Sequence, residues 1–342
     1  VRQTHLLIRG AYNKPGAPVE AGTPAILPAM KQQGAVNRLG LARWLTAPEH
    51  PLTSRVMINR LWQMCFGRGL VRTTEDFGSQ GQSPSHPGLL DWLSLRFIDS
   101  GWDIRELLRT IVTSATYRQD SRSSPELTEK DPENILLARG RRYRLPAEVI
   151  RDNALSSSGL LVRKIGGAPV RPYEVAVSFK PLKRDKGEGL YRRSLYTFWK
   201  RTAPAPVMMS LDASKREVCA VRRERTASPL QALVLMNDPQ LVEAARILGQ
   251  RLLKKHAENS AAMLGEMFRM LTGRNPGDSE KKILNRLYRE QLDFFQANPE
   301  QAEKFLKTGD AAADKELAPA RLAAAGAVAN VLLNFDEAVM KR

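Results

Sequence analysis

The sequence is 342 residues long, is 42% hydrophobic and carries a formal net charge of +17 at pH 7. That length and hydrophobic fraction suit one large domain or two ordinary ones with a substantial core, and they exclude a disordered chain. The longest apolar tract, residues 322–333, is shorter than the roughly 20 residues that a membrane-spanning helix needs. We therefore interpret this tract as a buried helix.

The two cysteines constrain the kind of site that the chain can hold. Cys65 and Cys219 lie far apart in the sequence, which excludes a CxxCH haem attachment site, a paired CxxC zinc site and a disulfide scaffold. A single bridge between them and two separate thiols both remain open. The chain begins at Val1 with no long apolar stretch behind it, so no signal peptide is visible, and we interpret it as a processed or excised piece.

More than half of the net positive charge lies in residues 161–230, which we call the basic segment. It holds 16 Lys and Arg against 6 Asp and Glu, interleaved with aromatic residues. Such a pattern can bind nucleic acid, an acidic glycan or an acidic protein surface, and it can equally tie helix ends and carboxylates together inside a domain. The candidate binding residues are Arg192, Arg193, Trp199, Lys200, Arg201, Arg216, Arg222, Arg223 and Arg225.

The first third of the chain has an extended start followed by helices. Residues 4–10 are typical of a strand, residues 13–16 of a turn, and the stretch to Pro28 of extended chain. A helical pattern begins at Asn37, and three further helices are predicted after Pro51, from Pro87 and from Asp103. On the helix after Pro51, the apolar residues Met57, Leu61, Met64 and Cys65 share one face. The polar residues 120–132 predict a surface loop and a possible subdomain boundary.

The remaining two thirds alternate between helical and irregular patterns. A helix is predicted over residues 147–157, irregular chain over 159–190 and a short strand over 194–200. Ser228, Pro229 and Gln231 form a helix start, and Asp238-Pro239 starts a second helix ten residues later. Further helices are predicted over residues 259–272, 279–296 and 318–333.

These patterns predict a mainly α fold (α+β with a minor β component) in which helical regions flank the irregular basic segment. We divide the chain into residues 1–120 (an extended segment and helices), 121–160 (a loop and a connecting helix), 161–230 (the basic segment) and 231–342 (helices). We expect these four parts to form one integrated domain.

Catalytic candidates are few, and no catalytic motif is complete. The four histidines fit neither HExxH nor HxH, and no cysteine or carboxylate spacing completes a metal site. His50 and His86 each precede a proline at a helix start, where capping or packing explains them as well as catalysis does. Weak catalytic candidates are His50, His86, Asp76, Arg55 and Arg60, and whether the chain is an enzyme is left open.

Several runs of sequence resemble one family. HPLTSRV at residues 50–56, HPGLLDWL at 86–93, IVTSATYRQ at 111–119, LYRRSLY at 190–196 and WKRTAP at 199–204 are similar to the PSD1 domain, DUF1553. Two stretches depart from the family pattern. Met64-Cys65 replace a bulkier aromatic or histidine-containing pair, which weakens a haem or metal role for that helix, and residues 173–190 are shortened and lack a tryptophan, as in a trimmed binding loop.

The resemblance supplies a context for the chain and no mechanism. It implies an exported protein of planctomycetes and related bacteria, located in the periplasm or cell envelope, with PSCyt2 and cytochrome c-type neighbouring domains. No cofactor is then expected in this chain, and haem c is expected only in a neighbouring domain.

Three functional hypotheses follow. The first is an accessory or binding module that docks its neighbouring domains, an acidic protein or an acidic glycan. The second is an enzyme domain for carbohydrate or redox chemistry whose cofactor lies in a neighbouring domain. The third is nucleic-acid binding through the basic segment.

Overall fold

The computed structural model describes residues 3–30, 36–174 and 181–341. Within these residues the chain forms 14 α-helices and two sheets of two strands each, so the predicted mainly α fold with a minor β component is confirmed. The chain divides into two compact units, Val1–Gly140 and Arg141–Arg342. The four-part division made from the sequence stays a prediction. Residues 175–180, part of the predicted shortened loop, lie outside the described residues.

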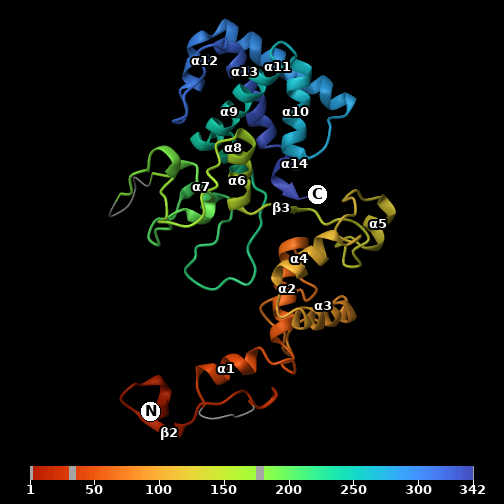
Figure 1. Cartoon of the computed structure of the whole chain (residues 1–342), viewed down its shortest axis with the longest axis vertical. Helices are drawn as coiled ribbons and strands as arrows, with labels where there is room; N and C mark the ends of the chain where they lie inside the picture. The colour runs from red at the N-terminus through yellow and green to blue at the C-terminus, as the bar shows by residue number, and fades with distance from the viewer. Residues whose placement is uncertain (1–2, 31–35, 175–180, 342) are drawn as a thin grey trace. The chain divides into compact units, whose positions relative to one another are not determined.

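The first unit starts with a hairpin and continues with helices (Figure 1). Strands β1 (Thr4–Leu7) and β2 (Pro15–Val19) pair antiparallel. Helices α2, α3 and α4 pack their apolar faces together around residues such as Ile58, Phe66, Leu93 and Phe97. The helices of this unit are α1 (Arg38–Leu45), α2 (Thr53–Phe66), α3 (Pro87–Asp99), α4 (Ile104–Thr113) and α5 (Pro125–Lys130).

Two details of the first unit differ from the sequence prediction. The sequence pattern places Met64 on one apolar face of α2 with Leu61 and Cys65, but its side chain is 65% exposed whereas theirs are buried. Residues 120–132 were predicted as a loop, yet they contain α5, which begins where the Ser124 hydroxyl accepts a hydrogen bond from the Leu127 amide. Serine followed by proline is a helix-start signal that the polar composition obscured.

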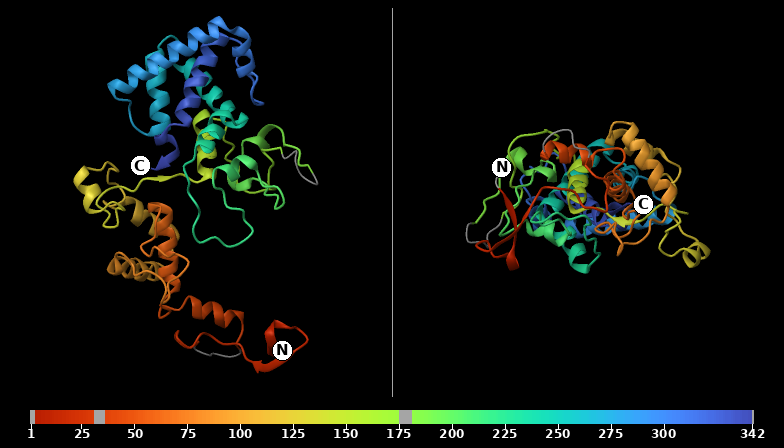
Figure 2. Two further views of the ribbon diagram at one scale, coloured as in Figure 1. Left: turned by 180° about the vertical axis from the view of Figure 1, so that it is seen from behind. Right: turned by 90° about the horizontal axis from the view of Figure 1, so that it is seen from below.

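The second unit is a helical bundle built around α13. Figures 1 and 2 show α9 and α13 side by side, with α10, α11 and α12 around them. Its helices are α6 (Ala147–Ser158), α7 (Pro206–Ser210), α8 (Pro229–Asn237), α9 (Pro239–His256), α10 (Ser260–Thr272), α11 (Asp278–Ala297), α12 (Pro299–Leu306), α13 (Pro319–Leu333) and α14 (Asp336–Val339). Strands β3 (Tyr143–Arg144) and β4 (Met340–Lys341) pair antiparallel.

The apolar tract at residues 322–333 is a buried helix, as predicted. Helix α13 crosses α9 where Gly249 and Gly326 meet, and a Cβ atom on Gly249 would lie 2.8 Å from the Gly326 nitrogen. The two glycines therefore allow the backbones to touch, which buries the alanine-rich face of α13. No helix within the described ranges is long and apolar enough to cross a membrane.

One strand prediction in the second unit is wrong. Residues 194–200 were predicted as a strand, but Ser194–Tyr196 form a 3-10 helix. The Asp152 carboxylate accepts hydrogen bonds from both the amide and the hydroxyl of Ser194, at 2.8 and 2.7 Å. The contact with Asp152 therefore holds this backbone in a 3-10 turn, although its local β propensity favours a strand.

A buried carboxylate fixes the chain between α12 and α13. Glu243 on α9 accepts hydrogen bonds from the Tyr191 hydroxyl and from the amides of Asp310 and Ala311, at 2.8, 2.7 and 2.6 Å. Gly309 lies beside it with φ +88°, and a Cβ atom there would come within 2.3 Å of the Glu243 carboxyl carbon. Only glycine fits this turn without displacing Glu243.

We expect Gly309→Ala to lower the free energy of unfolding by about 2 to 4 kcal/mol, because it combines a left-handed backbone with a clash against a buried charge. Chemical denaturation measures this loss. The matched control is Gly265→Ala in the interior of α10, where an added Cβ meets nothing within 4 Å. That change should leave stability equal or raise it by up to about 1 kcal/mol. Equal effects of the two changes would contradict the role of Gly309.

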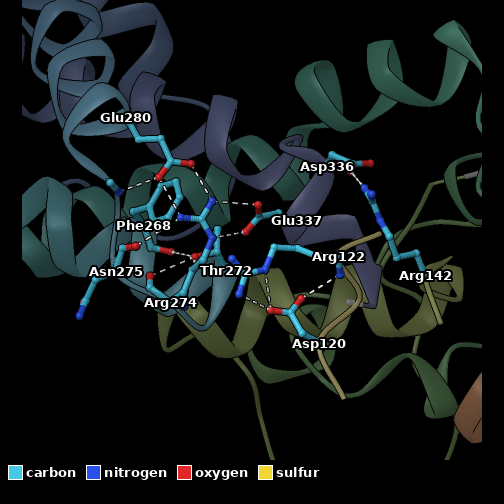
Figure 3. Close-up of polar contacts among 11 residues, drawn as sticks. Asp120, Arg122, Arg142, Phe268, Thr272, Arg274, Asn275, Glu280, Asp336 and Glu337 are labelled. Carbon is cyan, nitrogen blue, oxygen red and sulfur yellow. Dashed lines mark hydrogen bonds and ion pairs between the residues drawn. The ribbon is translucent and has the colours of Figure 1, made fainter. Parts of the chain in front are cut away.

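A bridging arginine ties α10 to the start of α11 and to α14 (Figure 3). The Arg274 guanidinium donates to both oxygens of Glu280 and both oxygens of Glu337, at 2.6 to 2.8 Å. It also lies over the Phe268 ring, 4.9 Å from its centroid. The hydrogen bonds from Arg274 lower the pKa of Glu280 to about 2, and the Gly277 amide adds to this effect.

The lowered pKa of Glu280 predicts a component of acid sensitivity. The folded state binds this proton more weakly than the unfolded state, so the stabilisation is present above the usual glutamate pKa of 4.5 and is lost as the pH falls towards 2. We expect Arg274→Gln to reduce the loss of unfolding free energy between about pH 5 and about pH 2. The control Arg286→Gln, which removes an exposed pair with Glu290 at 3.7 Å, should not change it. Identical pH profiles of wild type and Arg274→Gln would refute this.

Candidate anion-binding site

The basic segment is anchored by a buried arginine on α6. The Arg151 side chain, 2% exposed, donates to the backbone carbonyls of Leu190 and Arg192 and to the amide oxygen of Gln240 on α9. It also donates to the Ser194 hydroxyl at 3.1 Å. These contacts fix the middle of the segment against two helices.

Arg192, a predicted binding residue, points inward. Its guanidinium donates to the carbonyls of Lys164, Gly166 and Ala168, and it lies 3.9 Å from the centroid of the Tyr196 ring. A side chain so enclosed holds an irregular loop together and presents no free face to a partner. Arg192 therefore has a structural role.

The other predicted binding residues divide into engaged and exposed groups. Arg216 lies over the ring of half-buried Trp199 at 4.8 Å, Arg223 pairs with Glu148 at 2.8 Å, and Arg225 lies over Tyr143 at 4.4 Å. Lys200 is half-buried. Of the predicted binding residues, Arg193, Arg201 and Arg222 are exposed, and their side chains make no hydrogen bond or ion pair within the described parts of the chain.

A narrow pocket forms where the end of the basic segment meets β3. Arg144, Arg223 and Arg225 line it together with Asp212, and Leu145, Pro146, Leu211 and Glu224 complete the wall. We call these residues the arginine pocket. The open space is about 10 Å³, room for about one oxygen-sized atom.

Asp212 organises one side of the arginine pocket. One oxygen of its carboxylate accepts hydrogen bonds from the amide and hydroxyl of Thr226 and from the side-chain amide of Gln231, at 2.6, 2.8 and 3.1 Å. Burial raises the pKa of Asp212, but these hydrogen bonds and nearby Arg144 outweigh it, so the net pKa is lowered. The contacts close the base of the 213–225 loop, which Figures 1 and 2 show projecting from the helices.

Two arginines of the arginine pocket carry buried donors without acceptors. The Nε and Nη2 atoms of Arg144 and the Nη1 atom of Arg225 are buried and, among the described residues, find no hydrogen-bond partner. Burial lowers the pKa of both guanidinium groups, and nearby Asp212 counteracts this only in part at Arg144. Unmet buried donors on charged groups are costly, so an acceptor atom placed among them would be bound favourably.

The five weak catalytic candidates of the first unit have local roles. The His50 Nδ1 atom accepts from the amides of Leu52 and Thr53 at the start of α2, and its ring packs edge-on against Trp44. His86 is half-buried beside Ser85, and Asp76 accepts from the Gly78 amide. Arg55 pairs with Asp91 at 2.7 Å, and Arg60 is exposed. Within the described part of the chain, none of the five bonds to another of the five.

The cysteines and metal ligands add no further site in the described ranges. Cys65 is buried in the core of the first unit, and Cys219 is exposed on the 213–225 loop. No group of three or more His, Cys, Asp or Glu side chains in the described residues is placed to hold a metal ion.

Comparison with known families decides the relationship that the sequence motifs indicated. The family model PSD1, protein of unknown function (DUF1553), matches residues 37–288, which is well over half of the chain. The chain belongs to the PSD1 family. No curated protein and no solved structure matches it.

The arginine pocket shows what sequence reasoning missed in this PSD1 domain. Arg223 and Arg225 were predicted as binding residues, whereas Arg144 lies outside the basic segment and was overlooked. Its signal was the run Arg141-Arg142-Tyr143-Arg144, which is as basic as the segment itself. Asp212 is one of many carboxylates in the sequence, and nothing local distinguishes it.

Asp212 yields a prediction about the loop base. Asp212 has φ 62°, a left-handed conformation that asparagine tolerates better than alanine. We expect Asp212→Ala to cost about 2 to 3 kcal/mol of unfolding free energy and to speed amide exchange at Thr226, because three donors lose their acceptor. Asp212→Asn keeps one acceptor oxygen and should cost about half as much. Unchanged exchange in Asp212→Ala would show that the carboxylate does not hold the loop.

Proposed function

We propose that this PSD1 domain is a binding module that accepts a carboxylate group of an acidic partner in the arginine pocket. The observation that carries the proposal is the set of buried, unpartnered donors on Arg144 and Arg225. A carboxylate supplies the missing acceptor and offsets the desolvated charge in the same step.

The composition of the pocket favours a carboxylate over a phosphate. Its space admits about one ligand oxygen. Two carboxylates, Asp212 and Glu224, also line it, and they repel a phosphate dianion more strongly than a singly charged group. The second oxygen of a bound carboxylate would lie outside, towards half-exposed Arg223. These features support the binding hypothesis over nucleic-acid binding.

The family resemblance supplies the proposed setting. We propose that the domain acts in an exported periplasmic or cell-envelope protein and that its partner is a neighbouring PSCyt2 or cytochrome c-type domain, an acidic protein or an acidic glycan. Haem c, where the whole protein has it, would then be held by a neighbouring domain and not by this chain. All three partner classes share the carboxylate that the pocket requires.

The test compares acidic probes across matched variants of the full chain. Poly-L-glutamate represents an acidic protein, polygalacturonate an acidic glycan, and duplex DNA a phosphate polymer. We expect Arg144→Ala and Arg225→Ala each to weaken binding of the carboxylate polymer by about 10- to 100-fold, the worth of about 1.5 to 3 kcal/mol in a charge-assisted hydrogen bond. Calorimetric titration at fixed salt measures this.

The control removes one positive charge elsewhere in the basic segment. Arg184 pairs with Asp310 at 2.9 Å and does not line the arginine pocket, so Arg184→Ala should change affinity far less. Arg225→Lys keeps the positive charge but loses the planar guanidinium and its paired N–H donors. Its affinity therefore distinguishes bidentate recognition from an effect of charge alone. Binding that falls equally in Arg184→Ala, or DNA bound more tightly than both carboxylate polymers, would refute the proposal.

A further inference from the structure

Helix α3 in the first unit carries large apolar side chains on its outer face. Leu90, Leu93 and Phe97 are buried against α2 and α4, as a core-facing stripe requires. On the opposite face, Trp92 is 51% exposed and Leu95 is 61% exposed. Three residues apart on one helix, this tryptophan and leucine are neighbours and together form an exposed apolar surface.

These two residues form the floor of a shallow groove of about 520 Å³, within the usual range for small-molecule sites. The rim is made by Arg96, Asp99 and Ser100 of α3 and its C-terminal end and by Glu106 of α4. We call this set the α3 groove. It lies wholly within the first unit.

The rim of the α3 groove is polar, and hydrogen bonds fix several of its side chains. The Arg96 guanidinium donates to the Glu106 carboxylate at 3.1 Å and lies 5.6 Å from the centroid of the Trp92 ring. These two contacts restrain the side chains of Glu106 and Trp92. The Ser100 hydroxyl is fixed between the Phe97 carbonyl and the Asp103 amide. The Asp99 side chain is exposed and makes no hydrogen bond or ion pair with any residue in the described ranges.

We propose that the α3 groove binds a neutral saccharide. A sugar ring has an apolar face of C–H groups that can lie on the flat Trp92 ring, and its edge carries adjacent hydroxyls. Carboxylates accept from such hydroxyls, and the guanidinium donates to them, so Asp99, Glu106 and Arg96 supply both partners that a pair of hydroxyls needs.

The charges of the rim select against an acidic ligand. Asp99 and Glu106 place two negative groups against the single positive group of Arg96, so a uronate or sulfated sugar would be repelled. The α3 groove thus differs in ligand class from the arginine pocket, and this inference does not depend on the function proposed for that pocket.

The experiment titrates the full chain with neutral oligosaccharides, namely hexamers of β-1,4-glucan, β-1,3-glucan and β-1,4-mannan, by calorimetry. We expect at least one hexamer to bind. Trp92→Ala should weaken that binding by about tenfold or more, whereas Trp92→Phe, which keeps a smaller aromatic face, should weaken it by only about two- to fivefold. Asp99→Asn, which keeps an acceptor but also adds a donor, should have an intermediate effect.

The control is Leu195→Ala, which removes a 71% exposed apolar side chain in the second unit and should leave saccharide affinity unchanged. Thermal unfolding of each variant verifies that the fold is intact, as expected for surface positions. The proposal is overturned if no hexamer binds the wild type, or if Trp92→Ala binds it as tightly as the wild type does. Binding of polygalacturonate that depends on Trp92 would likewise overturn the choice of a neutral ligand.

Discussion

The buried guanidinium of Arg151 is the contact on which the second unit depends. The basic segment has almost no regular secondary structure, so its backbone carbonyls cannot all satisfy one another. Arg151 gathers those of Leu190 and Arg192 and joins them to Gln240 on α9. One side chain thereby replaces the hydrogen-bond ladder that a strand would have provided, and the irregular segment gains a defined course between α6 and α9.

Arginine side chains have two different roles in the second unit. Arg151 and Arg192 are enclosed by carbonyl oxygens and help to hold the fold. Arg144 and Arg225 are also partly enclosed, but several of their donors face no acceptor in the described residues. A charge count cannot separate these cases, because it records how many arginines are present and not which ones have their hydrogen bonds satisfied. The Nε atom of Arg192 is also buried without a partner among the described residues, but its other donors reach three carbonyl oxygens. Arg144 and Arg225 differ because they line an open pocket in which a ligand atom could meet their unpaired donors.

Helix boundaries were largely predictable, because their signals are local. Ser228 and Gln231 form the predicted capping box, and Asp238 caps α9 through the amides of Gln240 and Leu241. Such signals act over three or four residues, which sequence reading can inspect directly. The capping at Asn259 and the left-handed Gly273 likewise mark the two ends of α10.

The wrong predictions and the candidate site depend on contacts between residues that are distant in sequence. The strand predicted over 194–200 does not form because Ser194 donates hydrogen bonds to Asp152, about 40 residues away. The inward course of Arg192 depends on carbonyls about 25 residues earlier. The arginine pocket joins Arg144 to residues 212–225, which are distant in sequence. No periodicity or propensity contains such pairings, because they arise only when the helices pack.

The pairing of β3 with β4 has a mechanical consequence. Tyr143 lies opposite Lys341 and Arg144 opposite Met340, so the first and last strands of the second unit are hydrogen-bonded to each other. Tension applied along the chain across this unit would load that short pairing before it reached the helical bundle. Arg144 lies on β3, one of the two strands of this pairing. A pull that separated β3 from β4 would move Arg144 out of the arginine pocket without parting α9 from α13, so the binding that we propose for the pocket would be sensitive to force.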